Sequence, residues 1–419
     1  MVRVLDLYCG MGGLSLGFIA GLEDVVVHGL DIDRYAVMTY NYNLKRFNAE
    51  ARVQDVLVWR PRGDYDIIIG GVPCQPYSTA NTKKRGREHP LYPTLPRFFD
   101  IVLELRPKAF LMENVKGLIT KKMKPLLLEQ LRRVMPHYRI TYRVLNAAFY
   151  GVPQRRERLF VLGIRRDLDV TPELPPPTHA EKETMTLMGR LHRWITVREA
   201  IGDLLEKIPL KLQKPHWSRY RRINSYEQPS WTIRSNSDRE IIIPLTPEQA
   251  ERIRREREDD RRHYAKMEFP DSLDKLSRTI SSHTVEGTKR ETIVLPITEH
   301  ILLNNKIYGY DWSKREISLD KPSYTITEKH RCGQLVSTPI MYRRLTVREC
   351  LRLQSFPDWW GFPEEISISR RYKLVGEAVP SILAYRLAVK IGELLGLKTK
   401  KPSKEIFQLP YYDRAFPTS

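Results

Sequence analysis

The first part of the chain alternates short, continuous apolar runs with longer segments whose apolar residues have helical spacing. The continuous runs predict buried strands, and they occur in VRVLDLY, VVVHGLDID, DYDIIIGG, KAFLMENV and RLFVLGI. Segments between them, such as LPRFFDIVLEL, predict helices. This alternation predicts an α/β fold with a doubly wound, Rossmann-like parallel sheet, whose ligands bind at the carboxyl ends of the strands.

The pattern changes near residue 168, where the proline-rich stretch TPELPPPTH leads into a more polar and less periodic region. We expect 1–167 to form a catalytic and cofactor-binding domain, and 168–338 to form a smaller, β-rich domain. The β-rich character is suggested by three related strand-like segments, PSWTI, LSRTI and PSYTI. Helical spacing returns in 339–419, where VPSILAYRLAVKIGELLGL predicts an amphipathic helix that packs back on the first domain.

The composition narrows the class of protein. With 41% hydrophobic residues among 419, the chain can bury an ordinary core, and no apolar stretch approaches the ~20 residues of a membrane span. Without a secretory signal pattern, we expect a cytoplasmic protein that does not bind membranes. The net charge of +20 favours a polyanionic partner, above all nucleic acid. The four cysteines have no CxxC spacing, so we expect neither disulfides nor a metal.

The sequence DLYCGMGG places Gly10, Gly12 and Gly13 directly after the first predicted strand. Glycines here let the backbone turn tightly and let a ligand approach it without a Cβ in the way. A dinucleotide fingerprint requires a third glycine where Ser15 stands, and no P-loop lysine follows, which weakens both phosphate-binding interpretations.

Three acidic residues, one before this turn and two after it, suit a ligand that contains adenosine. Asp31 ends the second predicted strand, where an acid that binds ribose hydroxyls is expected. Asp55 can accept from an adenine amino group, and Asp6 near the turn suits an ammonium group. S-adenosylmethionine has both features, because its adenosine carries no phosphates and its methionine part carries an ammonium group.

Cys74 follows the predicted strand DIIIGG at the ligand-binding edge, between Pro73 and Pro76. Glu113 ends a neighbouring strand and supplies a carboxyl group at the same edge. A thiolate paired with a carboxylic acid suits attack on a ring that is protonated as it is attacked. The polar, basic run TANTKKRGREHP after Cys74 predicts a lid that closes over nucleic acid.

In order along the chain, DLYCGMGG, LDID, VQDV, GGVPCQPYS, MENV, YGVPQRRER, RRLTVRECLRLQSFP and VGEAVP resemble the motifs of the DNA (cytosine-5)-methyltransferase family of restriction-modification systems. The resemblance covers 1–167 and 340–396, and the family's target recognition domain lies in the gap between them. It implies a sequence-specific enzyme that transfers a methyl group from S-adenosylmethionine to cytosine in double-stranded DNA and releases S-adenosylhomocysteine.

The resemblance also implies residue roles. Cys74 adds to carbon 6 of a flipped-out cytosine, and Glu113 binds the ring nitrogen and the exocyclic amine. Arg156 and Arg158 hold the base and anchor the site, with Arg158 nearer the cytosine carbonyl oxygen and Arg156 closer to the thiol. One position departs from the family, because Glu377 stands where asparagine is usual.

The remaining contacts are expectations of the same kind. The expected cofactor-binding residues are Asp6, Tyr8, Gly10, Gly12, Gly13, Leu14, Asp31, Ile32, Asp55, Val56, Pro73, Ala378 and Val379. The expected DNA-binding residues are Gln75, Ser78, Lys83, Lys84, Arg85 and Arg87.

Alternative functions remain to be weighed. A tRNA cytosine methyltransferase on the same scaffold would carry a Cys-Phe-Thr motif before RRLT, and none occurs. A non-catalytic DNA-binding regulator would need neither Cys74 nor Glu113, and a dehydrogenase would leave the Pro-Cys-Gln and Glu-Asn-Val motifs unexplained. We expect a monomer at the nucleoid; the recognised base sequence and the existence of a cognate restriction endonuclease stay open.

Overall fold

The computed structural model describes residues 1–78, 85–187, 189–205, 223–224, 229–231, 240–244 and 340–417. Contacts divide the chain into two units. The first contains Met1–Lys207, Glu227–Asp238 and Thr346–Ser419, and the second contains Ile208–Tyr226 and Arg239–Leu345. The assignment of 168–338 to a recognition domain stays a prediction.

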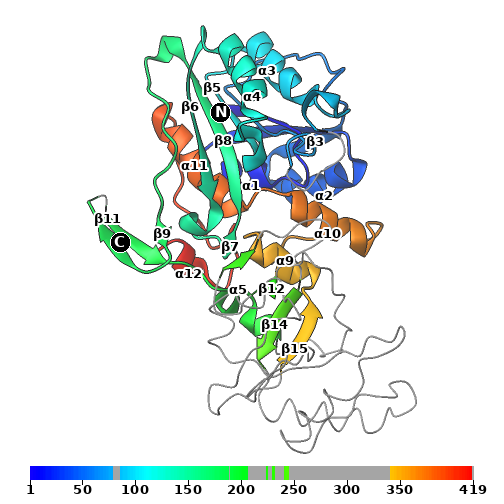
Figure 1. Ribbon diagram of the computed structural model, residues 1–419, viewed down its shortest axis with the longest axis vertical. Coiled ribbons are helices and arrows are strands. Elements are labelled where there is room, and N and C mark those ends of the chain that lie inside the picture. The colour runs from blue at the N-terminus through cyan, green and yellow to red at the C-terminus, as the bar shows by residue number, and fades with distance from the viewer. Residues whose placement is uncertain are drawn as a thin grey trace, which may run out of the picture. The chain divides into compact units, whose positions relative to one another are not determined.

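A seven-stranded sheet forms the centre of the first unit, in the order β3-β2-β1-β4-β5-β8-β6 (Figure 1). The five strands from β3 to β5 in this order run parallel, which confirms the doubly wound arrangement. The strands are β1 (Val2–Leu7), β2 (Val25–Asp31), β3 (Ala49–Val53), β4 (Ile67–Gly71), β5 (Ala109–Val115), β6 (Tyr138–Asn146) and β8 (Glu157–Arg165).

The prediction of an entirely parallel sheet is wrong at β8, which runs antiparallel to both β5 and β6. Only a short 3₁₀ turn, Ala147–Tyr150, and the two-residue strand β7 (Gln154–Arg155) separate β6 from β8. Without a crossover helix, neighbouring strands joined in this way must be antiparallel. Sequence reasoning missed both edge strands, β3 and β6, because neither contains a continuous apolar run.

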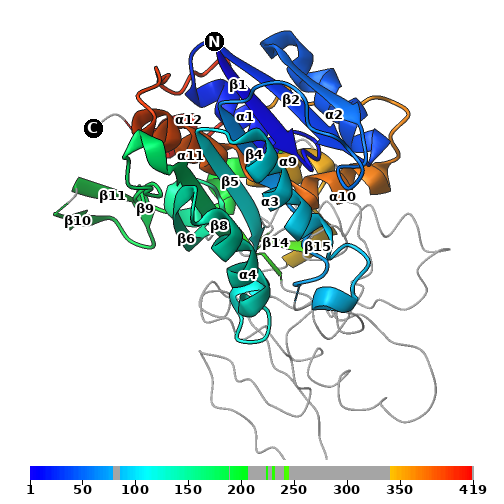
Figure 2. The same ribbon diagram turned by 90° about the horizontal axis from the view of Figure 1, so that it is seen from above.

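Helices cover both faces of the sheet, with α3 and α4 on one face and α1 and α11 on the other (Figure 2). Helix α9 begins with a capping box, in which Thr346 and Glu349 satisfy each other's backbone N–H groups. The helices are α1 (Gly13–Gly21), α2 (Arg34–Leu44), α3 (Thr94–Leu105), α4 (Lys124–Val134), α5 (Val197–Leu205), α9 (Val347–Leu353), α10 (Ile368–Glu377), α11 (Ser381–Leu394) and α12 (Tyr412–Ala415). Among the described residues, none of these helices is long and apolar enough to cross a membrane.

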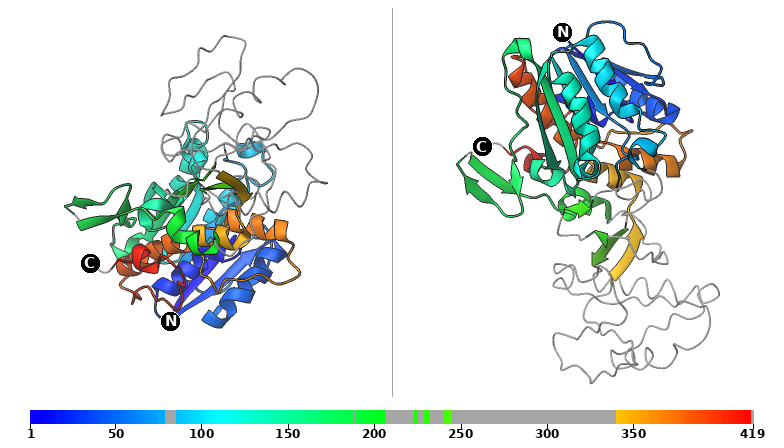
Figure 3. Two further views of the ribbon diagram at one scale, coloured as in Figure 1. Left: turned by 90° about the horizontal axis from the view of Figure 1, so that it is seen from below. Right: turned by 45° about the horizontal axis from the view of Figure 1, so that its top comes forward.

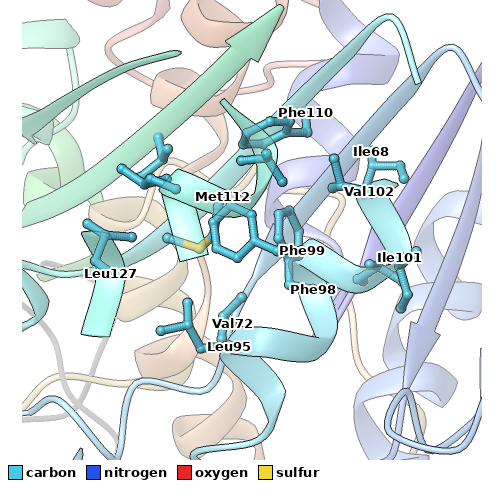
Figure 4. Packing of buried hydrophobic residues seen from close by; sticks show 14 of the residues in the cluster. Ile68, Val72, Leu95, Phe98, Phe99, Ile101, Val102, Phe110, Met112 and Leu127 are labelled. Carbon is cyan, nitrogen blue, oxygen red and sulfur yellow. The ribbon is translucent and has the colours of Figure 1, made fainter. Parts of the chain in front are cut away.

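The main apolar cluster lies between the sheet and helices α3 and α4 (Figure 4). Alternate strand residues reach it, because side chains of a strand point to opposite faces in turn. In β5, for example, Phe110 and Met112 join the cluster, where Phe110 packs edge-to-face against Phe98 and Phe99 of α3. Glu113 follows at the carboxyl end of the same strand, so the packed core holds that carboxyl group in place.

On the other face, α1 and α11 approach very closely. Three glycines of α1 make this possible: a Cβ would lie 2.2 Å from the Val379 carbonyl oxygen at Gly13, 2.4 Å from Ala384 Cβ at Gly17 and 3.1 Å from Ala388 Cβ at Gly21. The segment before α11 therefore packs against the turn that follows β1, and α11 itself packs along α1.

We expect Gly13→Ala to destabilise the protein by about 2–3 kcal/mol, because the new methyl group collides with a backbone carbonyl that cannot move away alone. The measurement is thermal or urea-induced unfolding. Gly396→Ala is the control, since Gly396 has φ +65° and a Cβ there meets nothing within 4 Å. It should cost only about 1–2 kcal/mol of backbone strain. Equal stability of the two variants would contradict the packing explanation.

A small sheet of β9 (His179–Ala180), β10 (Thr184–Thr186) and β11 (Gly189–Arg193) lies beside α12 (Figure 3). The buried His179 joins them: its Nε2–H donates to the Arg414 carbonyl oxygen at 2.9 Å, and Nδ1 lies 2.8 Å from Thr178 Oγ1. Burial lowers the pKa of His179 to about 4, from its usual 6.5. The imidazole is therefore neutral in the folded protein.

This histidine predicts a loss of stability on acidification. Between pH 6.5 and about 4 the unfolded chain binds a proton at His179 that the folded protein does not, so the free energy of unfolding falls as pH falls. The full effect is at most about 3 kcal/mol. Unfolding measured at pH 7.5 and pH 5 should show a smaller pH dependence in His179→Gln than in the wild type. Equal pH dependence in His179→Gln and the wild type would refute the assignment.

The second unit contains a three-stranded sheet in the order β12-β14-β15. Its strands are β12 (Ile223–Asn224), β14 (Glu240–Pro244) and β15 (Ile340–Arg344). The segments LSRTI and PSYTI lie outside the described residues. The PSWTI segment belongs to the first unit, where β13 (Ser230–Trp231) pairs with β7.

Candidate active site

The turn after β1 is tied to the end of β2. The Asp31 carboxylate accepts the backbone N–H of Gly10 at 2.8 Å and that of Asp33 at 2.8 Å. Gly10 has φ +54°, and a Cβ built on it would meet no atom within 4 Å. The structure thus keeps one side of the turn open at Gly10, beside an acid.

Gly12 and Gly13 have a different environment. A Cβ on Gly12, which has φ +98°, would lie 2.6 Å from Leu44 Cδ1, and one on Gly13 would meet Val379. These two glycines therefore let α2 and the segment before α11 close around the turn. Leu14 and Val379 are buried there, as is Ala378.

Asp6 is fully buried beneath the turn. Its Oδ2 accepts the hydroxyl of Ser15 at 2.6 Å, and Ser15 in turn accepts that of Tyr40 at 2.9 Å. Oδ1 has no hydrogen-bond partner among the described residues. Burial raises the pKa of Asp6 to about 7. Ser15, which interrupts the dinucleotide fingerprint, is thus the hydrogen-bond donor of this buried acid.

The other expected cofactor residues lie around the same edge. Tyr8 has φ 59° and donates its hydroxyl to the Thr94 carbonyl oxygen at 3.0 Å. Ile32 is 68% exposed, although it is apolar. Asp55 accepts the backbone N–H of Leu57 at 2.9 Å. Val56 is buried.

Cys74 lies in a turn that follows β4 and is half-buried. Its carbonyl oxygen accepts the backbone N–H groups of Tyr77 at 3.0 Å and Ser78 at 2.9 Å. The Asn114 side chain donates to the Val72 carbonyl oxygen at 3.2 Å and so joins this turn to β5. Gly117 leaves room for the Tyr77 carbonyl oxygen, 2.1 Å from where its Cβ would lie.

Glu113 and Arg158 form a nearly buried ion pair, in which Arg158 Nε lies 3.0 Å from Glu113 Oε1. The side chain of Arg158 is 15% exposed and that of Glu113 is 9% exposed. The antiparallel direction of β8 makes this pair possible, because Arg158 at its start pairs with Val115 at the end of β5. In the parallel arrangement predicted from the sequence, Arg158 would lie at the opposite edge. Residue Gly71 of β4 pairs with Glu113, so the Cys74 turn begins at the same level.

Burial raises the pKa of the Cys74 thiol above its usual value. Arg158 and, less strongly, Arg156 lower it, whereas Glu113 raises it. The arginines thus favour ionisation, as their proximity suggested, but burial outweighs them. Burial likewise raises the pKa of Glu113 against the effect of both arginines. In the free protein the thiol is protonated at neutral pH.

Arg156 is fully buried and donates from Nη1 to the Gly376 carbonyl oxygen at 3.1 Å. Burial first, and then the charge of Arg158, lowers its pKa to about 9. Of the two arginines, Arg158 acts more strongly on the thiol. Arg156 links the thiol side of the site to the end of α10.

The expected DNA-binding residues follow Cys74. Gln75 is exposed and Ser78 half-buried, while Lys83 and Lys84 lie outside the described residues. The remaining two contact the protein itself: Arg85 donates to the Tyr77 carbonyl oxygen at 3.1 Å, and Arg87 pairs with Glu129 of α4.

Sequence reasoning missed two residues that position the Cys74 turn, Asn114 and Gly117. It also missed three exposed lysines at the start of α4, which are Lys121, Lys122 and Lys124. The 3₁₀ turn Gly86–Glu88 packs there, since a Cβ on Gly86 would lie 3.4 Å from Met123 Sδ. The run KKMK was the available signal. Within the described part of the chain, no group of three metal-binding side chains occurs.

Comparisons with known proteins agree with this geometry. Two bacterial relatives are similar over nearly the whole chain: Type II methyltransferase M.FnuDI of Fusobacterium nucleatum is 29% identical, covering 98% of this chain and 100% of its own, and M.XorII of Xanthomonas oryzae pv. oryzae is 29% identical, covering 96% and 87%.

Solved structures share the fold. DNMT2 of Spodoptera frugiperda has a TM-score of 0.55 at 17% identity, covering 94% of this chain and 100% of its own. The methyltransferase EhMeth of Entamoeba histolytica has a TM-score of 0.52 at 14% identity, covering 94% and 98%. Both likenesses support the methyltransferase α/β fold. The family model for C-5 cytosine-specific DNA methylases matches residues 2–393, and the chain therefore belongs to the C-5 cytosine-specific DNA methylase family.

Proposed function

We propose that this enzyme methylates carbon 5 of cytosine within a specific sequence of double-stranded DNA, through a covalent adduct on Cys74. The observation that supports this most directly is the thiol of Cys74 beside the buried Glu113–Arg158 pair, at the same sheet edge as the open turn at Gly10. Membership of a DNA methylase family favours DNA over tRNA as the substrate. We assign target recognition to residues within 168–338.

S-adenosylmethionine is the proposed methyl donor, and the residues around the β1 turn fit it. Space is open at Gly10, the Asp31 carboxylate is beside it, and the buried Oδ1 of Asp6 lacks a partner among the described residues. Asp31 would bind the ribose hydroxyls, Asp55 the adenine amino group, and Asp6 would favour the ammonium group. When bound, this cofactor supplies an electrophilic methyl group.

Carbon 5 of cytosine is a poor nucleophile, so covalent catalysis first adds the Cys74 thiolate to carbon 6. Protonated Glu113 donates to the ring nitrogen and stabilises the charge that addition pushes into the ring. A neutral Glu113 no longer raises the pKa of the thiol and leaves the charge of Arg158 uncompensated. Because the ring nitrogen accepts a hydrogen bond, bound cytosine favours a proton on Glu113 and the loss of a proton from Cys74.

After methylation, the carbon 5 proton passes to solvent, the carbon 6–sulfur bond breaks and the 5,6 double bond re-forms, which releases the Cys74 thiolate and the product. The target carbon is inaccessible in a stacked duplex, so the cytosine must be flipped out, which costs a few kcal/mol. We assign the compensating phosphate contacts to Arg85, Arg87 and the lysines at the start of α4, because these cationic side chains lie beside the Cys74 turn.

The named relatives are type II methyltransferases. On that basis we propose a restriction-modification context, in which a separate endonuclease cuts the same unmethylated sequence. We further propose that the enzyme acts on nucleoid DNA as a monomer, because the candidate site is formed by one chain.

Methyl transfer from tritiated S-adenosylmethionine tests this function, with DNA of mixed sequence and tRNA as parallel substrates. We expect label in DNA alone, and bisulfite sequencing of the product should place 5-methylcytosine within one recurring sequence. Label in tRNA alone would overturn the proposed substrate, and label in neither would overturn the activity.

A further inference from the structure

Glu377, the last residue of α10, lies between the two halves of the site. On the thiol side, the carbonyl oxygen of the preceding Gly376 accepts a hydrogen bond from Arg156 at 3.1 Å. On the cofactor side, the Val379 carbonyl oxygen packs against Gly13 of the glycine turn. The backbone on either side of Glu377 is therefore held in place, by Arg156 on the thiol side and by the glycine turn on the cofactor side.

Charged side chains connect the Glu377 carboxylate to the glycine turn. Lys373 Nζ lies 3.9 Å from Glu377 Oε2 and 3.8 Å from Asp33 Oδ2, and Arg370 Nη1 lies 3.3 Å from the same Asp33 oxygen. Asp33 donates its N–H to Asp31, which holds Gly10. Burial, together with Asp33 and Asp31, raises the pKa of Glu377, while Lys373 and Arg370 oppose this.

A purely structural role does not explain this residue. A carboxylate at the C-terminus of a helix interacts unfavourably with the helix dipole. The pair with Lys373 has the less favourable order, with lysine four residues before glutamate, and both side chains are more than 40% exposed. Such a pair contributes little to stability. The position of the charge is explained better by a ligand.

We propose that Glu377 is a specificity-determining residue, whose carboxylate favours the cationic sulfonium of S-adenosylmethionine over the neutral thioether of S-adenosylhomocysteine. This inference rests on the proposed function. A thiol attached to carbon 6 of cytosine fixes the neighbouring carbon 5, and the transferred methyl group must lie between that carbon and the cofactor at Gly10. Glu377 lies in the chain between the residues that contact Arg156 and Gly13, and it interacts electrostatically with both Cys74 and Asp31, so its carboxylate can act on the one charge by which cofactor and product differ.

The electrostatic effect has a definite sign and size. A carboxylate several ångströms from a cation in a partly solvated cleft changes its affinity by about tenfold, and leaves that of a neutral analogue unchanged. Removing the carboxylate should therefore weaken binding of the cofactor and not of the product. The same change should lower the pKa of Cys74, because Glu377 raises it. The Glu377 carboxylate thus favours exchange of S-adenosylhomocysteine for S-adenosylmethionine, although it lowers the fraction of Cys74 that is thiolate.

Calorimetric titration of both ligands into the free protein tests the proposal without relying on turnover. We expect Glu377→Gln to lower the ratio Kd(S-adenosylhomocysteine)/Kd(S-adenosylmethionine) about tenfold, and Glu377→Asp, which keeps the charge, to retain most of it. Glu393→Gln is the matched control, because it removes a carboxylate at the far end of α11, about 20 Å along the helix from its start.

A pH series adds a readout that packing alone would not change. In the wild type the ratio should fall on acidification as Glu377 is protonated, and in Glu377→Gln this component should be absent. An unchanged ratio in Glu377→Gln, or an equal loss of affinity for both ligands, would overturn the inference while leaving the proposed function intact. Failure of the wild-type protein to bind either ligand would instead overturn the proposed cofactor, and the inference with it.

Discussion

Cys74→Ser is expected to reduce methyl transfer by at least about a thousandfold, because a hydroxyl group at neutral pH provides almost no anionic nucleophile for carbon 6. The side chains are nearly the same size, and the turn around Cys74 is held by its backbone carbonyl oxygen. Affinity for DNA should therefore change only slightly. The measurements are tritium incorporation into DNA and DNA binding by fluorescence anisotropy.

Cys350→Ala is the control for removal of a thiol, because Cys350 is buried in α9. It should keep its activity below the unfolding temperature. DNA carrying 5-fluorocytosine provides a direct test of the covalent step, since no proton can leave carbon 5 and the adduct should persist on a denaturing gel. Persistent adduct with Cys74→Ser, or methyl transfer close to the wild-type rate, would rule out Cys74 as the nucleophile.

Glu113→Gln is expected to lower kcat by about a hundredfold to ten-thousandfold, because glutamine cannot give a proton to the cytosine ring. Its amide oxygen can still accept from Arg158, so the fold should survive. The free thiol should respond in the opposite direction. Since Glu113 raises the pKa of Cys74 and Arg158 lowers it, the variant should react faster with iodoacetamide at neutral pH.

Slower methyl transfer together with a more reactive thiol would show that Glu113 has a catalytic role, because a misfolded site would not produce both effects. Glu157→Gln is the matched control. Glu157 begins β8 and pairs with Lys116 at 3.2 Å, with both side chains more than half exposed. Its loss should alter neither rate by more than a few-fold. Slower alkylation in Glu113→Gln than in the wild type would contradict the electrostatic account of the thiol.

Local patterns in the sequence were sufficient for most of the sheet. Buried strands are continuous apolar runs, and five of the seven, β1, β2, β4, β5 and β8, were recognisable without knowledge of their neighbours. The direction of β8 was not recognisable, because strand direction depends on the connection before it and not on the residues of the strand. The edge strands β3 and β6 were missed for a similar reason, since their polar residues carry no signal until their partners are known.

The sequence by itself determined the family, the order of the motifs and the chemistry of individual side chains, because these depend on residue type and spacing. Only the tertiary structure decided which groups meet and in what state. It brought Arg158 to Glu113 by reversing β8, directed Gly12 and Gly13 toward protein and Gly10 toward open space, and raised the pKa of the Cys74 thiol by burial despite the nearby arginines. Distances and burial arise from segments far apart in the chain, so a local pattern cannot specify them.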